Sequence, residues 1–158
     1  KDGAKLERCA MKYRISLLVM AVVCGGSESS ATEMAWLEVD TLESRLAGSD
    51  HTEVPVSELL PEGRILCAVG SYAFDLPEGY DTAKEDLENA GLLPVAEGNG
   101  LLFSVDEERH LHSAFALSVW PDPVILDVAE PLCIPAASAQ IDLRKDTRSL
   151  IIKLERRE

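Results

Sequence analysis

Residues 139–155 read AQIDLRKDTRSLIIKLE, and this stretch has the clearest pattern in the chain. Apolar residues alternate with polar ones from Ala139 to Leu143 and again from Leu150 to Leu154, on either side of a polar turn at Lys145-Asp146-Thr147. Because successive side chains of a strand point to opposite faces, each half predicts a strand with one buried and one solvated face. The stretch therefore predicts an antiparallel hairpin near the carboxyl end.

Further strands are predicted upstream of this hairpin. Ile65 to Val69 is continuously apolar, which is typical of a central strand covered on both faces. The turn signal Gly98-Asn99-Gly100 predicts a hairpin between strands at 93–96 and 101–105. Two more strands are expected, because residues 110–120 alternate between two faces and residues 124–128 are mostly apolar.

Two short helices are also predicted. Residues 32–47 have apolar side chains at helical spacing, and residues 48–56 are loop-like and can serve as a tether. Asp81 or Thr82 can cap a second helix that ends at Ala90. The apolar stripe of this helix consists of Ala83, Leu87 and Ala90.

Together these elements predict an α+β fold. We expect an antiparallel β-sheet of five to seven strands, arranged as a meander with the C-terminal hairpin, and one or two short helices packed on it. A small β-sandwich is the alternative. The single globular domain is expected at 64–158, after a weak helix and a loop or tether at 32–63.

The amino terminus has the layout of a secretory signal peptide. Lys12 and Arg14 follow Met11, the expected start, and precede an apolar run and then small residues. The run rises roughly 13 Å as a helix, short of a bilayer core of about 30 Å, and so predicts no transmembrane segment. We expect residues 1–31 to be an upstream extension and signal peptide, removed before Thr32. A buried N-terminal strand or helix is the alternative.

The four cysteines form two groups. Cys9 and Cys24 lie in or before the signal, and lipid attachment at Cys24 is an alternative fate of this segment. Cys67 and Cys133 lie in the expected globular domain. Because exported proteins meet an oxidising compartment, we expect these two to form a disulfide, with two buried free thiols as the alternative.

The chain is acidic. Its 158 residues include 15 Lys and Arg against 28 Asp and Glu, which gives a formal net charge of −13. Residues 1–31 carry five of the basic and three of the acidic residues, so the chain from Thr32 onward has a net charge of −15. Nucleic-acid backbones and anionic membranes are bound through clustered Lys and Arg, so this balance argues against both as partners. Within the chain from Thr32 onward, only the segment from Arg144 onward is basic.

His110 and His112 are the sharpest candidates for chemistry. Two residues apart on a predicted strand, they point the same way and can present two imidazoles to a metal ion. A third ligand is needed, for which Glu107, Glu108 and His51 are candidates. The alternative is that both histidines lie on a solvated strand face. The sequence predicts no cofactor, because no phosphate-binding glycine loop or calcium-binding loop occurs.

Two other features bear on function. Ser71 follows the apolar strand at 65–69 but lacks the Gly-x-Ser-x-Gly pattern of a nucleophile elbow. Trp36, Tyr72 and Trp120 are candidates for stacking on a ligand if they are exposed, and at least two of them are expected in the core.

The expected function is that of a small exported protein of the periplasm or cell envelope, which acts by binding a protein or ligand rather than by catalysis. A specific version is an acidic module that binds a cationic protein, since complementary charge steers such an encounter. One alternative is a small metal-dependent hydrolase that uses His110 and His112. Another is a subunit of an envelope complex that docks through the C-terminal hairpin.

Overall fold

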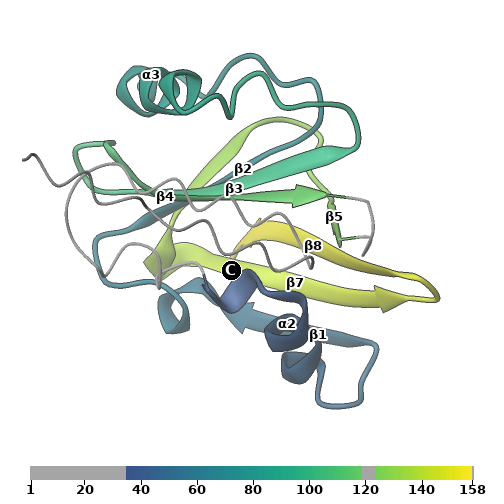
Figure 1. The fold of residues 1–158 in the computed structure, drawn as a ribbon. Helices are drawn as coiled ribbons and strands as arrows, with labels where there is room; N and C mark the ends of the chain where they lie inside the picture. The colour runs from purple at the N-terminus through teal and green to yellow at the C-terminus, as the bar shows by residue number, and fades with distance from the viewer. Residues whose placement is uncertain (1–34, 119–123, 158) are drawn as a thin grey trace, which may run out of the picture.

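The computed structural model describes residues 35–118 and 124–157 (Figure 1). The expected signal peptide, with Met11, Cys24 and the cleavage site before Thr32, lies outside the described residues, and so does Trp120. The helical elements of the described chain are η1 (Ala35–Leu37), α2 (Val39–Leu46), η2 (Val56–Glu58), α3 (Asp81–Asn89) and η3 (Ala136–Ser138). The strands are β1 (His51–Pro55), β2 (Ile65–Val69), β3 (Asn99–Val105), β4 (Leu111–Ser118), β5 (Val124–Leu126), β6 (Leu132–Pro135), β7 (Ala139–Asp146) and β8 (Ser149–Arg156).

The predicted C-terminal hairpin is confirmed. β7 and β8 pair antiparallel from Ala139 opposite Arg156 to Asp146 opposite Ser149. The edges of this hairpin take up two more strands, β1 antiparallel to β7 and β5 parallel to β8. The resulting order is β1-β7-β8-β5, and we call this sheet 1. Its buried apolar residues, among them Ile141, Leu143, Ile152 and Leu154, face the interior because the strand period places them on one side.

The apolar segment 65–69 forms β2, an inner strand of a second sheet with the order β4-β3-β2-β6, called sheet 2 here. Its predicted coverage on both faces is confirmed. Leu66 and Ala68 belong to the buried cluster shared with sheet 1, whereas Cys67 and Val69 belong to the cluster shared with α3. A strand with two buried faces has no polar side to present to solvent, which explains its continuous apolar run.

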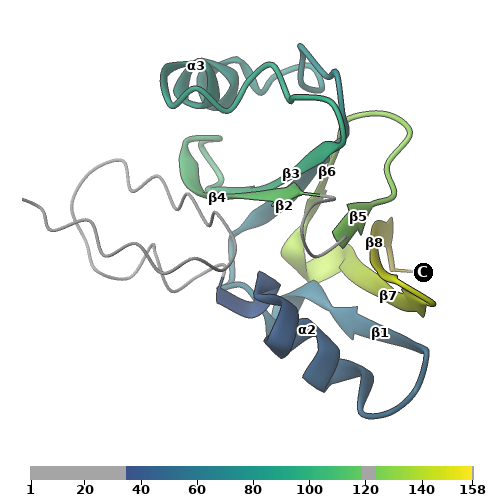
Figure 2. The same ribbon diagram turned by 45° about the vertical axis from the view of Figure 1, so that its right-hand side comes forward.

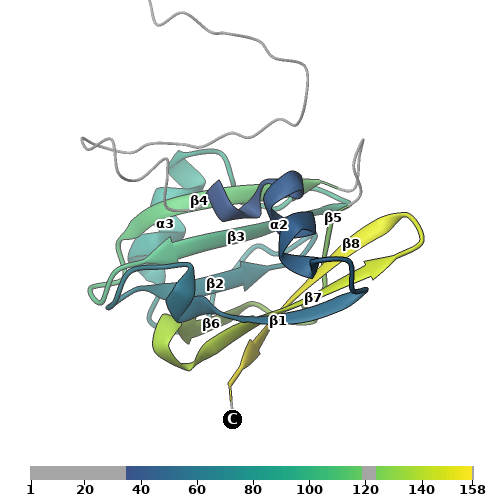
Figure 3. The same ribbon diagram turned by 90° about the horizontal axis from the view of Figure 1, so that it is seen from below.

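The described chain is arranged in layers (Figure 2). α3 covers one face of sheet 2, where Ala83 and Leu87 are fully buried. The opposite face of sheet 2 packs on sheet 1 through a larger apolar core. α2 lies beside β1 (Figure 3), and its Leu42 side chain joins the same core as Val54 of β1. Residues from the expected helix and tether at 32–63 therefore contribute to the core formed by residues 64–157.

The α+β class is confirmed, with short helices and mainly antiparallel strand pairing. The described chain has eight strands, and they form two four-stranded sheets rather than a single one. The face-to-face packing of the two sheets gives the α+β fold a sandwich-like centre.

Two local predictions are wrong. Residues 48–56 were expected to be a loop, but His51–Pro55 form β1, because the edge of β7 offers hydrogen-bonding groups that the strand pairs with. The turn signal at Gly98 does not join two strands, because no strand forms at 93–96. Val95 exchanges main-chain hydrogen bonds with the loop after β2 instead: Tyr72 N–H donates to Val95 O over 2.9 Å, and Val95 N–H donates to Ala73 O over 3.2 Å.

The ends of α3 follow one prediction and contradict another. Neither Asp81 nor Thr82 caps the start, because Tyr80 is the N-cap residue and no side chain bonds there. At the other end Gly91 has a φ of +71°, and the Leu92 N–H donates to Leu87 O. This geometry needs a residue without a Cβ, as the sequence predicts for this glycine.

Candidate functional site

An open cleft of about 640 Å³ lies at the end of β2, between two loops. One loop comprises residues 70–75 and follows β2, and the other comprises residues 127–131 and connects β5 to β6. Figure 2 shows the two loops rising on the same side of the molecule. Loops carried on a rigid sheet are a common location for binding residues, so this cleft is the candidate site.

The loop 70–75 is held in an uncommon conformation. Tyr72 has a φ of +63°, a left-handed conformation that an aromatic residue rarely adopts. The hydrogen bonds with Val95 fix the main chain there, and the Ser71 hydroxyl donates to Asn99 O over 2.7 Å. Such local strain persists only where the surrounding structure enforces it, and it is concentrated at functional sites.

Two aromatic rings are exposed on this loop. The residue exposures are 57% for Tyr72 and 68% for Phe74, the highest among the large hydrophobic residues that the structure describes. Trp36, by contrast, is 7% exposed and lies in the core. The prediction that at least two of the three aromatic candidates lie in the core depends on Trp120, which is outside the described residues. Phe74 was not among those candidates. The signal for it was an aromatic pair in a segment without strand or helix periodicity, between Gly70 and Pro77.

The electrostatic character of the cleft is acidic. Asp75 and Glu130 line it, and the described lining residues include neither Lys nor Arg. Lys84 Nζ donates to Asp75 Oδ1 over 3.0 Å and lowers the pKa of this carboxyl, so Asp75 stays ionised while its charge is offset by Lys84. The carboxylate of Glu97 accepts a hydrogen bond from the Tyr72 hydroxyl and raises the pKa of that hydroxyl. The exposed rings are therefore accompanied by negative charge.

The second wall of the cleft is anchored at both ends. Asp127 N–H donates to Ile152 O over 2.8 Å, which ties the start of the loop to sheet 1. At its far end β6 begins, and Cys133 of β6 forms the predicted disulfide with Cys67 of β2. Between these anchors, Val128 packs so closely on Gly70 that a Cβ on that glycine would lie 3.2 Å from the Val128 carbonyl oxygen.

Ser71 lies in the cleft wall, yet its contacts are structural. Its hydroxyl is donated to a main-chain carbonyl, and the described residues that line the cleft include no histidine. A serine nucleophile needs a base within hydrogen-bond reach. Among the described lining residues, Ser71 therefore has no histidine base beside it.

The two candidate metal ligands lie at the opposite end of the same sheet. His110 belongs to the turn before β4, with its Nε2 4.0 Å from Glu108 Oε2. His112 lies on β4 beside a bulge, with its Nε2 2.7 Å from Arg64 Nη2. Within 35–118 and 124–157, no three His, Cys, Asp or Glu side chains are grouped to hold a metal ion. Metal analysis of the purified protein remains the test of this hypothesis.

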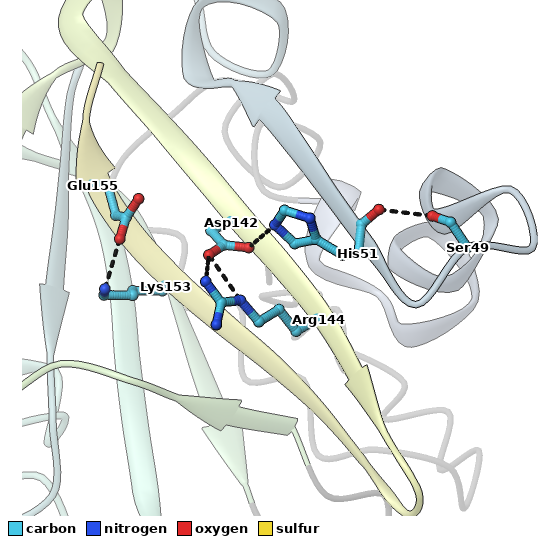
Figure 4. A network of polar contacts seen from close by, with 6 residues as sticks. All are labelled: Ser49, His51, Asp142, Arg144, Lys153 and Glu155. Atoms are coloured by element: carbon cyan, nitrogen blue, oxygen red, sulfur yellow. Dashed lines mark hydrogen bonds and ion pairs between the residues drawn. The ribbon is translucent and has the colours of Figure 1, made fainter. Parts of the chain in front are cut away.

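His51, the third proposed ligand, lies in the other sheet and takes part in a polar network (Figure 4). Its Nε2 is 2.8 Å from Asp142 Oδ1, and Arg144 donates to Asp142 Oδ2 from Nη2 over 2.6 Å and from Nε over 3.0 Å. Asp142 is 2% exposed, although the strand pattern placed it on the solvated face. Its two partners cover it, and sequence periodicity cannot show this.

This network resembles a catalytic relay in residue types only. The Ser49 hydroxyl donates to the carbonyl of His51 over 2.7 Å and to the carbonyl of Leu46 over 2.8 Å, so it is bonded to main chain (Figure 4). A nucleophile would have to contact the imidazole that activates it. The network is therefore a structural ion-pair cluster on the outer face of sheet 1.

The fold and the cleft define a class: a two-sheet α+β protein with one disulfide and an aromatic, acidic loop cleft. No helix of the described chain combines the length and the apolar character required to span a membrane. Comparisons with protein-family models, curated proteins and solved structures find no match for the chain.

Proposed function

We propose that the protein is an exported, non-enzymatic binding module that recognises a segment of a cationic protein in the cleft between loops 70–75 and 127–131. The observation that carries the proposal is the exposure of Tyr72 and Phe74, two residues apart in the sequence, on one wall of that cleft. Exposed aromatic rings that line a concave surface are typical anchors of protein interfaces.

The chemistry of the cleft indicates the kind of segment it takes. An apolar side chain of the partner can pack on the two rings, with Leu126 and Val128 opposite them. A neighbouring lysine or arginine can interact with Glu130 and with the faces of the aromatic rings. The formal charge of −15 for the chain from Thr32 onward adds long-range attraction for the same partner.

Export is the second part of the proposal. It is supported by the basic and apolar pattern before Thr32 and is compatible with the disulfide between Cys67 and Cys133. Mass spectrometry of the protein recovered from the native cell envelope or secreted fraction tests it. A mature chain that begins at or near Thr32, or at a lipid-modified Cys24, is the expected result. An unprocessed chain found only in the cytoplasm would contradict export.

Binding is tested with two synthetic peptides, one in which lysine alternates with leucine and one in which glutamate alternates with leucine. We expect the folded, oxidised protein to bind the lysine peptide with an affinity that falls as salt is raised, and not to bind the glutamate peptide. Replacing both Tyr72 and Phe74 with serine should lower the affinity at least tenfold, because each exposed anchor contributes roughly 1 kcal/mol or more.

A matched control is Ile125→Ser, which removes the other exposed large hydrophobic residue of the described chain without touching the cleft lining. This control should leave peptide affinity unchanged. Equal affinity for the two peptides, or an affinity that does not change with salt, would contradict the charge-based part of the proposal. Equal loss in the control and in the cleft variant would remove the cleft as the site.

A further inference from the structure

The disulfide lies at the base of the candidate cleft. Cys67 precedes Gly70, where one wall begins, by three residues, and Cys133 follows Pro131, where the other wall ends, by two. The two cysteines are directly opposite each other in the β2–β6 register. A covalent bond between them therefore sets the distance between the two cleft walls where the loops join sheet 2.

The strand that carries Cys133 has few other attachments. β6 is a four-residue strand at the edge of sheet 2, where β2 is its only ladder partner among the described strands. Ile134 is 1% exposed and anchors the downstream end in the core. Upstream, Leu132 is the remaining ladder position between the disulfide and the loop. The loop wall is thus held by the disulfide and the short β2–β6 ladder at one end, by Asp127 at the other, and by the partly buried side chains of Val128 and Leu132.

We infer that the Cys67–Cys133 disulfide is a positioning device for the cleft, so that its reduction weakens ligand binding while the two sheets remain folded. The inference rests on the proposed function, because it concerns regulation of the same site. With the bond intact, the walls are pre-ordered for a partner. Without it, the partner must order the segment 128–132 on binding, which lowers affinity.

The two cysteine residues differ in exposure, which favours attack by a reductant at Cys133. Cys67 is fully buried, whereas Cys133 is partly exposed on the edge strand. A thiolate of a dithiol reductant attacks the Cys133 sulfur, the S–S bond breaks, and Cys67 leaves as a thiolate that takes up a proton. The second thiol of the reductant then attacks the mixed disulfide and releases Cys133 as a thiol. The protein gains two electrons and two protons, and the reductant becomes a cyclic disulfide.

The first experiment measures this directly, without a ligand. Hydrogen exchange is followed by mass spectrometry in the oxidised protein and after reduction with dithiothreitol. We expect exchange in residues 70–75 and 128–132 to become fast on reduction, while β7 and β8 remain protected, although less strongly because the loop-closure stabilisation is lost. Unchanged exchange in both loops would overturn the inference. Loss of protection throughout both sheets would also overturn it, since the bond would then hold the whole fold.

The second experiment measures affinity for the lysine–leucine peptide. Reduction should lower it roughly tenfold, and the variant with Cys67→Ala and Cys133→Ser should bind like the reduced protein and show no response to dithiothreitol. If that double variant does not fold, Cys133→Ser alone, which keeps the buried Cys67 thiol, takes its place. Equal affinity in oxidised and reduced protein would contradict the inference.

The two proposals fail in different ways. If the oxidised protein does not bind the peptide, the proposed function is wrong, and the exchange experiment still decides whether the disulfide holds the loops. If the oxidised and reduced proteins bind equally well, the binding function stands and the positioning role of the disulfide is wrong.

Discussion

Asp142 is the clearest case in which one residue departs from the role its position predicts. It occupies a polar position of the alternating strand β7, yet His51 and Arg144 cover it almost completely. Burial acts to raise the pKa of its carboxyl. The hydrogen bonds and charge of Arg144, followed by the charge of His51, outweigh burial, so the pKa lies below its ordinary value. The ionised carboxylate therefore stabilises the folded state.

Replacing Asp142 with asparagine should lower the free energy of unfolding by about 1–3 kcal/mol at neutral pH, because the amide removes the carboxylate that is ion-paired with Arg144. Urea denaturation measures the change. Glu43→Gln is the control, since its ion pair with Lys145 is exposed on both sides; it should cost less than about 1 kcal/mol. Equal losses in the two variants would contradict the special role of Asp142.

The same carboxylate predicts a pH dependence. A group whose pKa is lower in the folded than in the unfolded state contributes stability above its unfolded pKa, about 3.9 for Asp, and loses it as pH falls through the folded value. The stability difference between the parent protein and Asp142→Asn should therefore shrink as the pH falls below about 4. If this stability difference does not change on acidification, the charge of the Asp142 carboxylate contributes nothing to the stability of the fold.

The side chain of Arg109, in the turn between β3 and β4, contacts the residues just before α3. Its guanidinium lies 4.4 Å from the ring centroid of Tyr80, and its Nη1 donates to Gly79 O over 2.8 Å. The turn between β3 and β4 is thereby attached to the start of α3. We expect Arg109→Gln to lower stability by about 1 kcal/mol and to speed hydrogen exchange in the first turn of α3. If Arg109→Gln speeds hydrogen exchange in the β3–β4 turn alone, the proposed link to α3 is wrong.

At the scale of elements, the contact between β3 and β5 depends on a glycine. A Cβ on Gly100 would lie 2.7 Å from the Cβ of Leu126, closer than atoms of packed side chains approach. The turn signal that predicted a hairpin at 98–100 thus has a different cause. Gly100 permits sheet 1 and sheet 2 to approach where β5 passes β3.

Gly100→Ala should therefore destabilise the protein by about 1–3 kcal/mol, because the close neighbour is the first side-chain atom of Leu126 and cannot rotate away. Thermal unfolding monitored by circular dichroism provides the measurement. Asn99→Ala, at a half-buried position next to it on β3, is the control and should have a smaller effect. If Gly100→Ala is as stable as the parent protein, β3 and β5 can move apart without loss of stability, and the prediction is wrong.

At the scale of the whole molecule, the disulfide closes a long segment of chain. Cys67 and Cys133 are 66 residues apart, and a loop of that length restricts the unfolded state by an amount worth about 4 kcal/mol. The variant with Cys67→Ala and Cys133→Ser should lose about this much stability in urea denaturation with an intact fold at room temperature. Oxidised and reduced parent protein with identical midpoints would contradict the prediction.

Local residue patterns were sufficient to predict the strands in which each face is buried or solvated along its whole length. The alternation of residues 139–155 predicted β7 and β8, and the unbroken apolar run 65–69 predicted an inner strand, because burial on one or two faces imposes those patterns directly. The Cys67–Cys133 pairing was also predictable, since elimination left one pair in the domain. Charge and the N-terminal pattern led to the expectation of an exported acidic binding protein, which remains a proposal.

Other properties depend on neighbours that are distant in the chain. β1 exists because β7 offers it an edge, and Asp142 is buried because His51 and Arg144 cover it. His112 takes the bulge position of the β3–β4 pairing, whereas His110 lies in the turn before β4. The cleft arises in the same way, since its walls are brought together by β2 and β6. Periodicity reports which face of an element is buried, whereas a site is made by contacts between elements, and those contacts are set only when the chain folds.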